Sequence, residues 1–219
     1  MTAAGPFGAA ALAEARKHCA ELARASARDQ WLGALYAPPE ARDALLALAS
    51  FDHEIRQARR RARDPHLAAM RLAWWRGAVR GERDEEAAGN PIALALRAAI
   101  EAFAPPRDWL EAMLDARLQE MAPQDDFTLA AFEAFAEESE GARLRLASWI
   151  SGGGKDLDAA SAHAPAGMAL ALTRMVASFP NCCAPKATRL RLEVNVVTLA
   201  SVPASWLVRL RIFGRAAST

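Results

Sequence analysis

The chain has 219 residues, of which 53% are hydrophobic and 24% are charged, and its formal net charge at neutral pH is +1. This length and balance fit one globular domain with a sizeable core, and they exclude a disordered or fibrous chain. A net charge so close to zero argues against a nucleic-acid-binding protein, because such binding rests on an excess of lysine and arginine.

Cysteine use and hydrophobic pattern bear on the cellular compartment. Cys19, Cys182 and Cys183 give neither an even disulfide framework nor paired metal-ligand spacing, which indicates a reducing compartment. Charged residues follow soon after the first apolar stretch, unlike in a signal peptide, and no stretch reaches the roughly 20 apolar residues that span a bilayer. We expect a cytoplasmic protein without a transmembrane segment that lies, at most, peripherally on the inner membrane.

Residues 9–150 are rich in alanine, leucine, arginine and glutamate, and their apolar positions recur at helical spacing, which predicts an all-α fold. Prolines and glycines separate the predicted helices, and Asp29 and Asp108 are placed as N-caps. The charged segment 81–89 is predicted to be a loop, and 123–126 a turn. In chain order we expect helices over about 9–26, 29–37, 40–63, 66–79, 91–103, 108–121, 129–150 and 159–176.

The sequence changes character after Pro180. Residues 190–197 mix β-branched and apolar side chains, and residues 202–213 interleave apolar side chains with Arg209 and Arg211. One interpretation is an irregular, poorly ordered tail, and another is a basic amphipathic patch for a membrane or a partner. We therefore predict a helical domain over 1–179 and a divergent tail over 180–219.

The most distinctive stretch, residues 51–76, reads FDHEIRQARRRARDPHLAAMRLAWWR. Arg71 lies between two apolar lines of the predicted helix, where it can stack on an indole, pair with a carboxylate or bind a phosphate. Adjacent tryptophans on a helix are more often packed in a core than exposed in a pocket, and both interpretations stay open. The two lines, about 100° apart, are Leu67, Met70 and Trp74 on one side and Leu72, Trp75 and Val79 on the other.

Three successive segments carry a family resemblance. They are residues 27–55 (ARDQWLGALYAPPEARDALLALASFDHEI), 71–76 (RLAWWR) and 89–96 (GNPIALAL). They resemble the first half of the squalene/phytoene synthase family, in particular its divergent branch whose mitochondrial member assists the assembly of respiratory complex I. The resemblance covers about residues 19–179. It implies an isoprenoid-synthase-like helical bundle, here truncated, around an apolar cavity with Phe51, Trp74 and Trp75 as candidate lining residues.

The resemblance also implies where metal ligands stand in active family members. There, two aspartate-rich motifs hold Mg²⁺ ions that grip a diphosphate leaving group. Matching Phe51 to the family's phenylalanine places Arg56, Gln57 and Arg60 at the first acidic positions, and the second motif falls at 172–179, with Ala177 and Ser178 in place of an acid. A guanidinium group cannot ligate Mg²⁺, so neither metal site is supported.

Arginine can still hold a phosphate directly. We therefore name a candidate surface for an anion or a partner, which comprises Arg56, Arg60, Arg71 and Arg76.

The remaining acids have simpler interpretations. Asp52 precedes Arg56 by one helical turn, which predicts an intrahelical ion pair. Glu133, Glu137 and Glu140, with Glu138, follow helical spacing and predict a solvated acidic face that pairs with the arginine-rich stretch 56–63.

Three functional hypotheses follow. The first is a non-catalytic binding or assembly factor, similar to the complex I factor, with no catalytic residue, metal or cofactor, and with a protein partner at a membrane or a prenyl lipid as its ligand. The second is a prenyl diphosphate-using transferase with Mg²⁺, which requires Asp52, Glu54 and the acids at 137, 138 and 140 to converge on one cavity. The third is a decayed, inactive family member.

Overall fold

A computed structural model describes residues 8–62, 64–120, 128–155 and 166–173. The chain divides into two compact units, Met1–Ala171 and Leu172–Thr219, and the following description concerns the first. Its described residues form helices and the turns that connect them, which confirms the predicted all-α class. The predicted domain boundary at 179, the turn at 123–126 and the tail after Pro180 lie outside the described residues and stay predictions.

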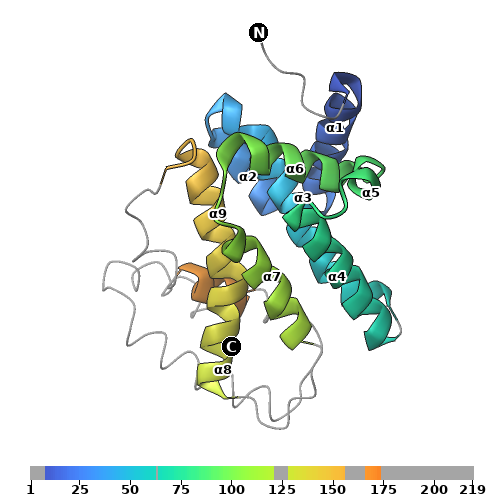
Figure 1. The fold of residues 1–219 in the computed structure, drawn as a ribbon. Coiled ribbons are helices and arrows are strands. Elements are labelled where there is room, and N and C mark those ends of the chain that lie inside the picture. The colour runs from blue at the N-terminus through green and yellow to red at the C-terminus, as the bar shows by residue number, and fades with distance from the viewer. Residues whose placement is uncertain (1–7, 63, 121–127, 156–165, 174–219) are drawn as a thin grey trace, which may run out of the picture. The chain divides into compact units, whose positions relative to one another are not determined.

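The helices follow the prolines and glycines of the sequence closely. α8, a π-helical turn η1 and α9 form one continuous helical run, and residues 166–173 are also helical. The bounds are α1 (Ala9–Ser26), α2 (Arg28–Tyr36), α3 (Pro39–Arg61), α4 (Pro65–Arg80), α5 (Asp84–Ala88), α6 (Pro91–Phe103), α7 (Arg107–Gln119), α8 (Leu129–Ala136), η1 (Glu137–Gly141) and α9 (Ala142–Ser151) (Figure 1).

Three local predictions were wrong. α2 and α7 each begin one residue before Asp29 and Asp108, and neither aspartate caps its helix by a side-chain hydrogen bond. Both carboxylates instead lie in the first turn, where the helix dipole favours a negative charge. The predicted loop at 81–89 contains α5, whose first turn carries three acids and is favoured for the same reason.

Proline and a capping side chain together define the first residues of two helices, α4 and α6. The Asp64 carboxylate accepts a hydrogen bond from the His66 backbone N–H, and Pro65 follows as the first residue of α4. Asn90 accepts from the backbone N–H groups of Ile92 and Ala93 at the start of α6. Such caps satisfy donors that a helix leaves free at its first turn, so α4 and α6 begin at defined residues.

The main hydrophobic core lies around α3, which contacts α1, α6, α4 and α9 (Figure 1). Phe51 of α3 is fully buried there, and its ring packs edge-to-face on Trp75 of α4 with centroids 5.3 Å apart. A buried aromatic pair of this kind stabilises beyond its area burial, and it fixes α4 against α3. Ile55, Leu72, Leu114 and Leu146 bring α3, α4, α7 and α9 into the same core.

A smaller alanine-rich cluster joins α1, α2 and α3, with Ala23, Ala34 and Ala49 among its members. Small side chains let these helices approach closely. Cys19 of α1 is buried in the main core, and burial raises the pKa of its thiol to about 11. This thiol is therefore protonated and shielded at neutral pH, as a packing residue rather than a nucleophile.

Candidate functional site

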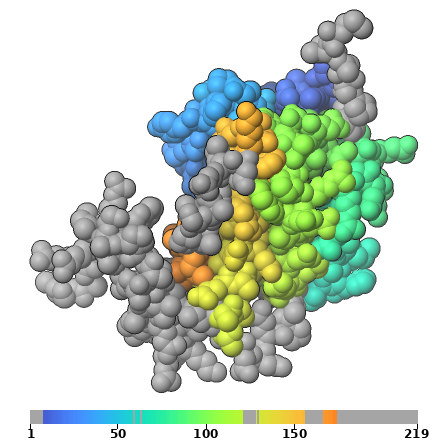
Figure 2. Space-filling model, turned by 60° about the vertical axis from the view of Figure 1, so that its left-hand side comes forward, coloured from blue at the N-terminus to red at the C-terminus, as the bar shows by residue number. Residues whose placement is uncertain are grey.

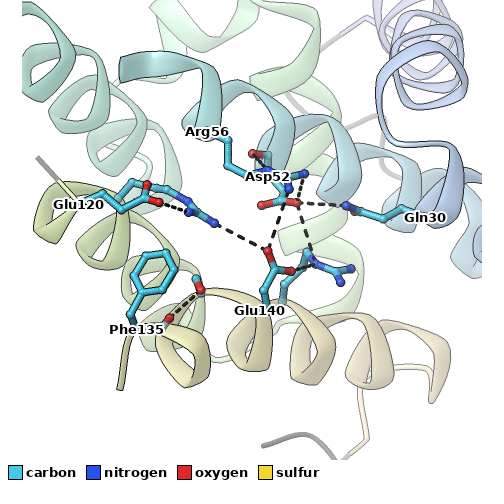
Figure 3. Close-up of polar contacts among 9 residues, drawn as sticks. Gln30, Asp52, Arg56, Glu120, Phe135 and Glu140 are labelled. Carbon is cyan, nitrogen blue, oxygen red and sulfur yellow. Dashed lines mark hydrogen bonds and ion pairs between the residues drawn. The ribbon is translucent and has the colours of Figure 1, made fainter. Parts of the chain in front are cut away.

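A cluster of buried charged side chains lies where α3, α7, η1 and α9 meet (Figure 3). We call it the charge cluster, and it consists of Asp52, Arg56, Arg117, Glu140 and Arg143. Asp52, Glu140, Arg117 and Arg143 are only 1%, 3%, 7% and 6% exposed. Charged side chains are rarely buried to this extent unless they are paired, so the pairing within the cluster decides what the site can do.

Asp52 is held from three helices. Its Oδ2 lies 2.7 Å from Nη2 of Arg56, one turn further along α3, and 3.9 Å from Nε of Arg143. Gln30 of α2 donates its side-chain amide to the same oxygen at 3.0 Å. The predicted Asp52–Arg56 pair is thus confirmed, but it is one side of a larger network.

Glu140 forms the opposite side of the network, and Figure 3 shows its carboxylate facing Asp52 across the arginines. Its Oε2 accepts from Nε of Arg143 at 3.0 Å, and its Oε1 lies 3.9 Å from Nη2 of Arg117 and 4.0 Å from Nη1 of Arg56. Glu120 pairs with Arg117 at the rim, at 3.1 Å. Arg143 therefore bridges the two buried carboxylates.

The π-helical turn η1 explains why Glu140 points inward. The Glu133, Glu137 and Glu140 spacing predicted one solvated face, yet the side chain of Glu137 is 56% exposed while that of Glu140 is 4% exposed. Ser139 donates its hydroxyl to the Phe135 carbonyl at 2.6 Å, which competes with the regular backbone hydrogen bond of the helix. The wider turn rotates the residues that follow, and π-turns are frequent at functional sites.

The prediction of a solvated acidic face is therefore wrong for Glu140, which is buried. The predicted pairing of this face with the arginine-rich stretch is confirmed at one contact, between Glu140 and Arg56. The reason is the extra residue in the π-helical turn η1, which changes the face on which Glu140 lies compared with a regular helix of 3.6 residues per turn. Ser139 and Gly141 on either side of Glu140 are the sequence signal for it, because serine hydrogen-bonds the preceding turn and glycine lowers helix propensity.

Arg117 and Arg143 are functional residues that the sequence reasoning missed. Arg117 follows Met113 and Leu114 on the buried face of α7, and Arg143 precedes Leu146 by three residues on that of α9. Arg117 also places its guanidinium carbon 5.4 Å from the Phe135 ring centroid. A cation at a core position of an amphipathic helix was the signal that could have found both residues.

The five acids required by the transferase hypothesis are not brought together. Asp52 and Glu140 meet in the charge cluster, but Glu54 pairs with Arg61, Glu137 with Arg145, and the Gln119 amide donates to Glu138. Among the residues that the structure describes, no group of three or more His, Cys, Asp or Glu side chains is placed to hold a metal ion.

The residues of the charge cluster do not fit Mg²⁺, the metal that the family resemblance implies. Mg²⁺ requires near-octahedral oxygen ligands at about 2.0–2.1 Å. Three guanidinium groups here surround two buried carboxylates, and each guanidinium offers five donors and no acceptor. Nε of Arg117 is buried without a hydrogen-bond partner among the described atoms, so the cluster has donors to spare rather than acceptors.

The four predicted surface arginines have different environments. Arg56 belongs to the charge cluster, while Arg76 pairs with Asp115 of α7. Arg60 is exposed near the end of α3, and Arg71 is exposed on α4, where it borders a groove of about 260 Å³. A shared anion site of all four residues stays a prediction.

The predicted cavity-lining aromatics have different environments. Phe51 lies in the core, whereas Trp74 and Trp75 both border the groove beside Arg71, which we call the α3–α4 groove. The Trp74 indole N–H donates to the Glu86 carboxylate at 2.7 Å, and this bond lowers the pKa of Glu86 together with the Arg83 contact.

A larger groove of about 520 Å³ lies between α2, α3 and α9, and we call it the α2–α9 groove. Leu45, Leu48 and Leu144 give it apolar walls, and Gln30 and Arg143 reach it from the charge cluster. Its lining is therefore mainly apolar, which suits an apolar ligand.

Comparison with known proteins places the chain in context. The squalene/phytoene synthase family model matches residues 23–183. Curated relatives carry the name NADH dehydrogenase (ubiquinone) complex I, assembly factor 6: the mouse (Mus musculus) and human (Homo sapiens) proteins are each 25% identical over 163 residues, covering 74% of this chain and 49% of the relative. The bovine (Bos taurus) protein is 25% identical over 164 residues. The chain spans about half the length of these relatives, and no solved structure matches it significantly.

Proposed function

The chain belongs to the squalene/phytoene synthase family, and on that premise we propose that it is a non-catalytic member that acts as an assembly factor for NADH dehydrogenase complex I. The charge cluster is the observation that carries this proposal. Arg56 stands where the resemblance implies a metal-binding acid, and it pairs with Asp52. Arg117 and Arg143 lie against the two oxygens of Glu140. A site so arranged stabilises the helix junction instead of gripping a metal-bound diphosphate.

The relatives supply the second support. Each carries a name that states a role in complex I assembly, and each matches about three quarters of this chain. An assembly factor acts by binding proteins, so a protein partner is the expected ligand. The chain spans about half the length of each relative. Binding of a protein partner is therefore a proposal and does not follow from the sequence match.

A prenyl lipid is a second candidate ligand, favoured by the α2–α9 groove. Its apolar walls fit an isoprenoid chain. Farnesyl diphosphate added without Mg²⁺ is expected to raise the thermal unfolding temperature of the chain. Ala147→Trp, which fills the groove, should remove that shift, and a shift that persists in the variant would place the lipid elsewhere.

The proposed location is the cytoplasm, with the protein lying peripherally on the inner membrane. Among the described residues, none of the helices has the length and apolar character needed to cross a bilayer. A peripheral position is compatible with this, and it depends on the protein partner.

Deleting the gene in its source organism tests the assembly function. We expect less assembled complex I on a native gel, with subcomplexes accumulating, and recovery when the wild-type chain is supplied. Unchanged complex I together with a loss of a squalene- or phytoene-like product would favour the transferase alternative instead.

A further inference from the structure

Large apolar side chains of α4 reach the surface beside the α3–α4 groove. Leu72 and Trp75 are buried in the core, but Leu67 and Met70 are 51% and 57% exposed, and Trp74 is half-buried on the same line of the helix. In the space-filling view the teal region that includes α4 forms the right-hand edge (Figure 2). Large apolar side chains exposed along one helix line mark an interaction surface.

A cation stands among these apolar side chains. Arg71 is exposed, follows Leu67 by four residues and precedes Trp74 by three, so it shares their face of the helix. It also lines the α3–α4 groove. Arg71 makes no ion pair with any residue that the structure describes.

Two carboxylates near the groove are each held by another arginine. Glu54 lines the groove, and its two oxygens accept hydrogen bonds from Nη1 of Arg61 at 3.0 and 2.9 Å. Glu86 of α5 accepts from Nη1 of Arg83 at 2.9 and 3.0 Å. The Arg71 guanidinium is therefore available to a ligand, and its charge and planar donor geometry match a carboxylate.

The apolar wall of the groove is held in place by the core. The indole rings of Trp74 and Trp75 pack edge-to-face with centroids 5.0 Å apart, and Trp75 packs in turn on Phe51. The hydrogen bond from Trp74 to Glu86, at 2.7 Å, fixes the outer indole. Binding against side chains that are already fixed costs less conformational entropy, so this wall is pre-formed for a ligand.

The size and composition of the groove favour a peptide over a whole small molecule. Its volume of about 260 Å³ lies below the range of about 300–1,000 Å³ that is typical of small-molecule pockets, so it fits one or two side chains. Tryptophan, arginine and methionine are enriched at protein interfaces, and tryptophan and arginine are frequent among the residues that carry the binding energy. All three types occur here, at Met70, Arg71 and Trp74, which indicates a protein partner.

We propose that the α3–α4 groove binds an acidic amphipathic segment of a protein partner. An apolar side chain of the segment packs against Ala58 and Trp74, and a carboxylate one helical turn away from it pairs with Arg71. Leu67 and Met70 cover the apolar face of the segment outside the groove. This proposal rests on the proposed function, which calls for a protein partner, and it adds where that partner binds and which chemistry it carries.

Selection of short random peptides displayed on phage, with the purified full chain as the target, tests the groove. We expect the enriched peptides to carry an aspartate or glutamate about three or four residues from a large apolar side chain, because this spacing places both on one face of a helix. Fluorescence anisotropy of a labelled enriched peptide then gives its Kd. Vesicles of phosphatidylglycerol and phosphatidylcholine are tested alongside.

Variants of the groove test the two contacts. Arg71→Glu should weaken binding of the acidic peptide at least about tenfold, because a pairing of opposite charges becomes a repulsion. A peptide whose acid is replaced by arginine should bind Arg71→Glu more tightly than the wild type, which a merely structural role of Arg71 would not produce. Trp74→Ala should also weaken the acidic peptide, because it removes a wall of the groove.

Arg28→Glu, on an exposed arginine of α2, is the matched control and should leave the Kd unchanged. Circular dichroism confirms that every variant is folded. A selection that enriches no acidic peptide overturns the proposal, and so does an enriched peptide that binds Arg71→Glu as tightly as the wild type. Vesicle binding that Arg71→Glu abolishes, without peptide binding, assigns the groove to a membrane and overturns the proposal as well.

The groove and the assembly function can fail separately, because the selection uses the purified chain alone. If deleting the gene leaves complex I unchanged while the peptide results hold, the assembly function fails and the groove remains a peptide site. If deletion lowers complex I and the Arg71→Glu chain restores it fully, the assembly function stands and the groove is not where its partner binds.

Discussion

At the scale of single residues, Glu140 and Asp52 show how two buried carboxylates are held at a junction between helices. Each buried carboxylate is matched by guanidinium groups from neighbouring helices, with Arg143 contacting both. Buried ion pairs add little net stability compared with apolar packing, but removing one partner is costly because the other charge stays buried.

Glu140→Gln keeps the size of the side chain and removes its charge. We expect the free energy of unfolding to fall by about 3–5 kcal/mol, because Arg143 and Arg117 lose a counter-charge in a buried setting. Urea denaturation measures the change. Glu137→Gln, whose carboxylate is 56% exposed and paired with Arg145, is the control and should cost less than about 1 kcal/mol. Equal losses of free energy of unfolding in both variants would contradict a stabilising role of the buried ion pairs of Glu140.

At the scale of elements, the helices could be predicted from the sequence, because prolines separate them and apolar residues recur at helical spacing within them. The helix over 91–103 was predicted with the observed bounds because Pro91 starts it and Pro105 follows its end. The charge cluster was not readable, because its members come from four elements and Glu140 is oriented by the π-helical turn η1. The pairing of Asp52 with Arg56 could be predicted from the sequence, since both residues lie on one helix at a separation of four residues.

Close approach of the helix at 166–173 to η1 gives an element-scale prediction. A Cβ atom added at Gly167 would lie 2.7 Å from the backbone nitrogen of Gly141, so Gly167→Ala forces the two elements apart. We expect a loss of about 1–3 kcal/mol in the free energy of unfolding. Gly33→Ala in α2 meets nothing within 4 Å and should stabilise the chain by about 0.5–1 kcal/mol. A Gly167→Ala variant that is as stable as the wild type, or more stable, would refute the close contact.

The contact between α4 and α7 predicts a pH dependence. Arg80 donates to both carboxylate oxygens of Glu111, at 2.9 and 2.7 Å, and this bond holds the pKa of Glu111 below its ordinary value of 4.5. A lowered folded-state pKa adds stability that is present above pH 4.5 and lost as the pH falls through the lower folded value.

The free energy of unfolding of the wild type should therefore exceed that of Glu111→Gln at neutral pH. The difference should be at most about 1 kcal/mol, since the ion pair is partly exposed. The difference should shrink towards zero in acid. Urea denaturation of both proteins over a pH series gives the comparison. A difference that stays constant from neutral to acid pH would show that the ion pair is not its source.

At the scale of the whole molecule, the chain is an all-α member of the squalene/phytoene synthase family, and among its described residues the buried carboxylates Asp52 and Glu140 are paired with arginines. The family was recognisable from residues 27–96, because the tryptophan pair and the segments around it are distinctive in type and order. The pairing of the buried carboxylates was only half predictable from the sequence: the contact of Asp52 with Arg56 was predicted, whereas the contacts of Arg117 and Arg143 required the fold.

Diphosphate release from farnesyl or geranylgeranyl diphosphate with Mg²⁺ tests the central claim most directly. With the purified full chain, we expect release no faster than in the absence of protein, because Asp52 and Glu140 are already bound by guanidinium groups. Mg²⁺-dependent release well above that background, abolished by Asp52→Asn in a variant that remains folded, would show that these carboxylates do ligate metal and would contradict the account.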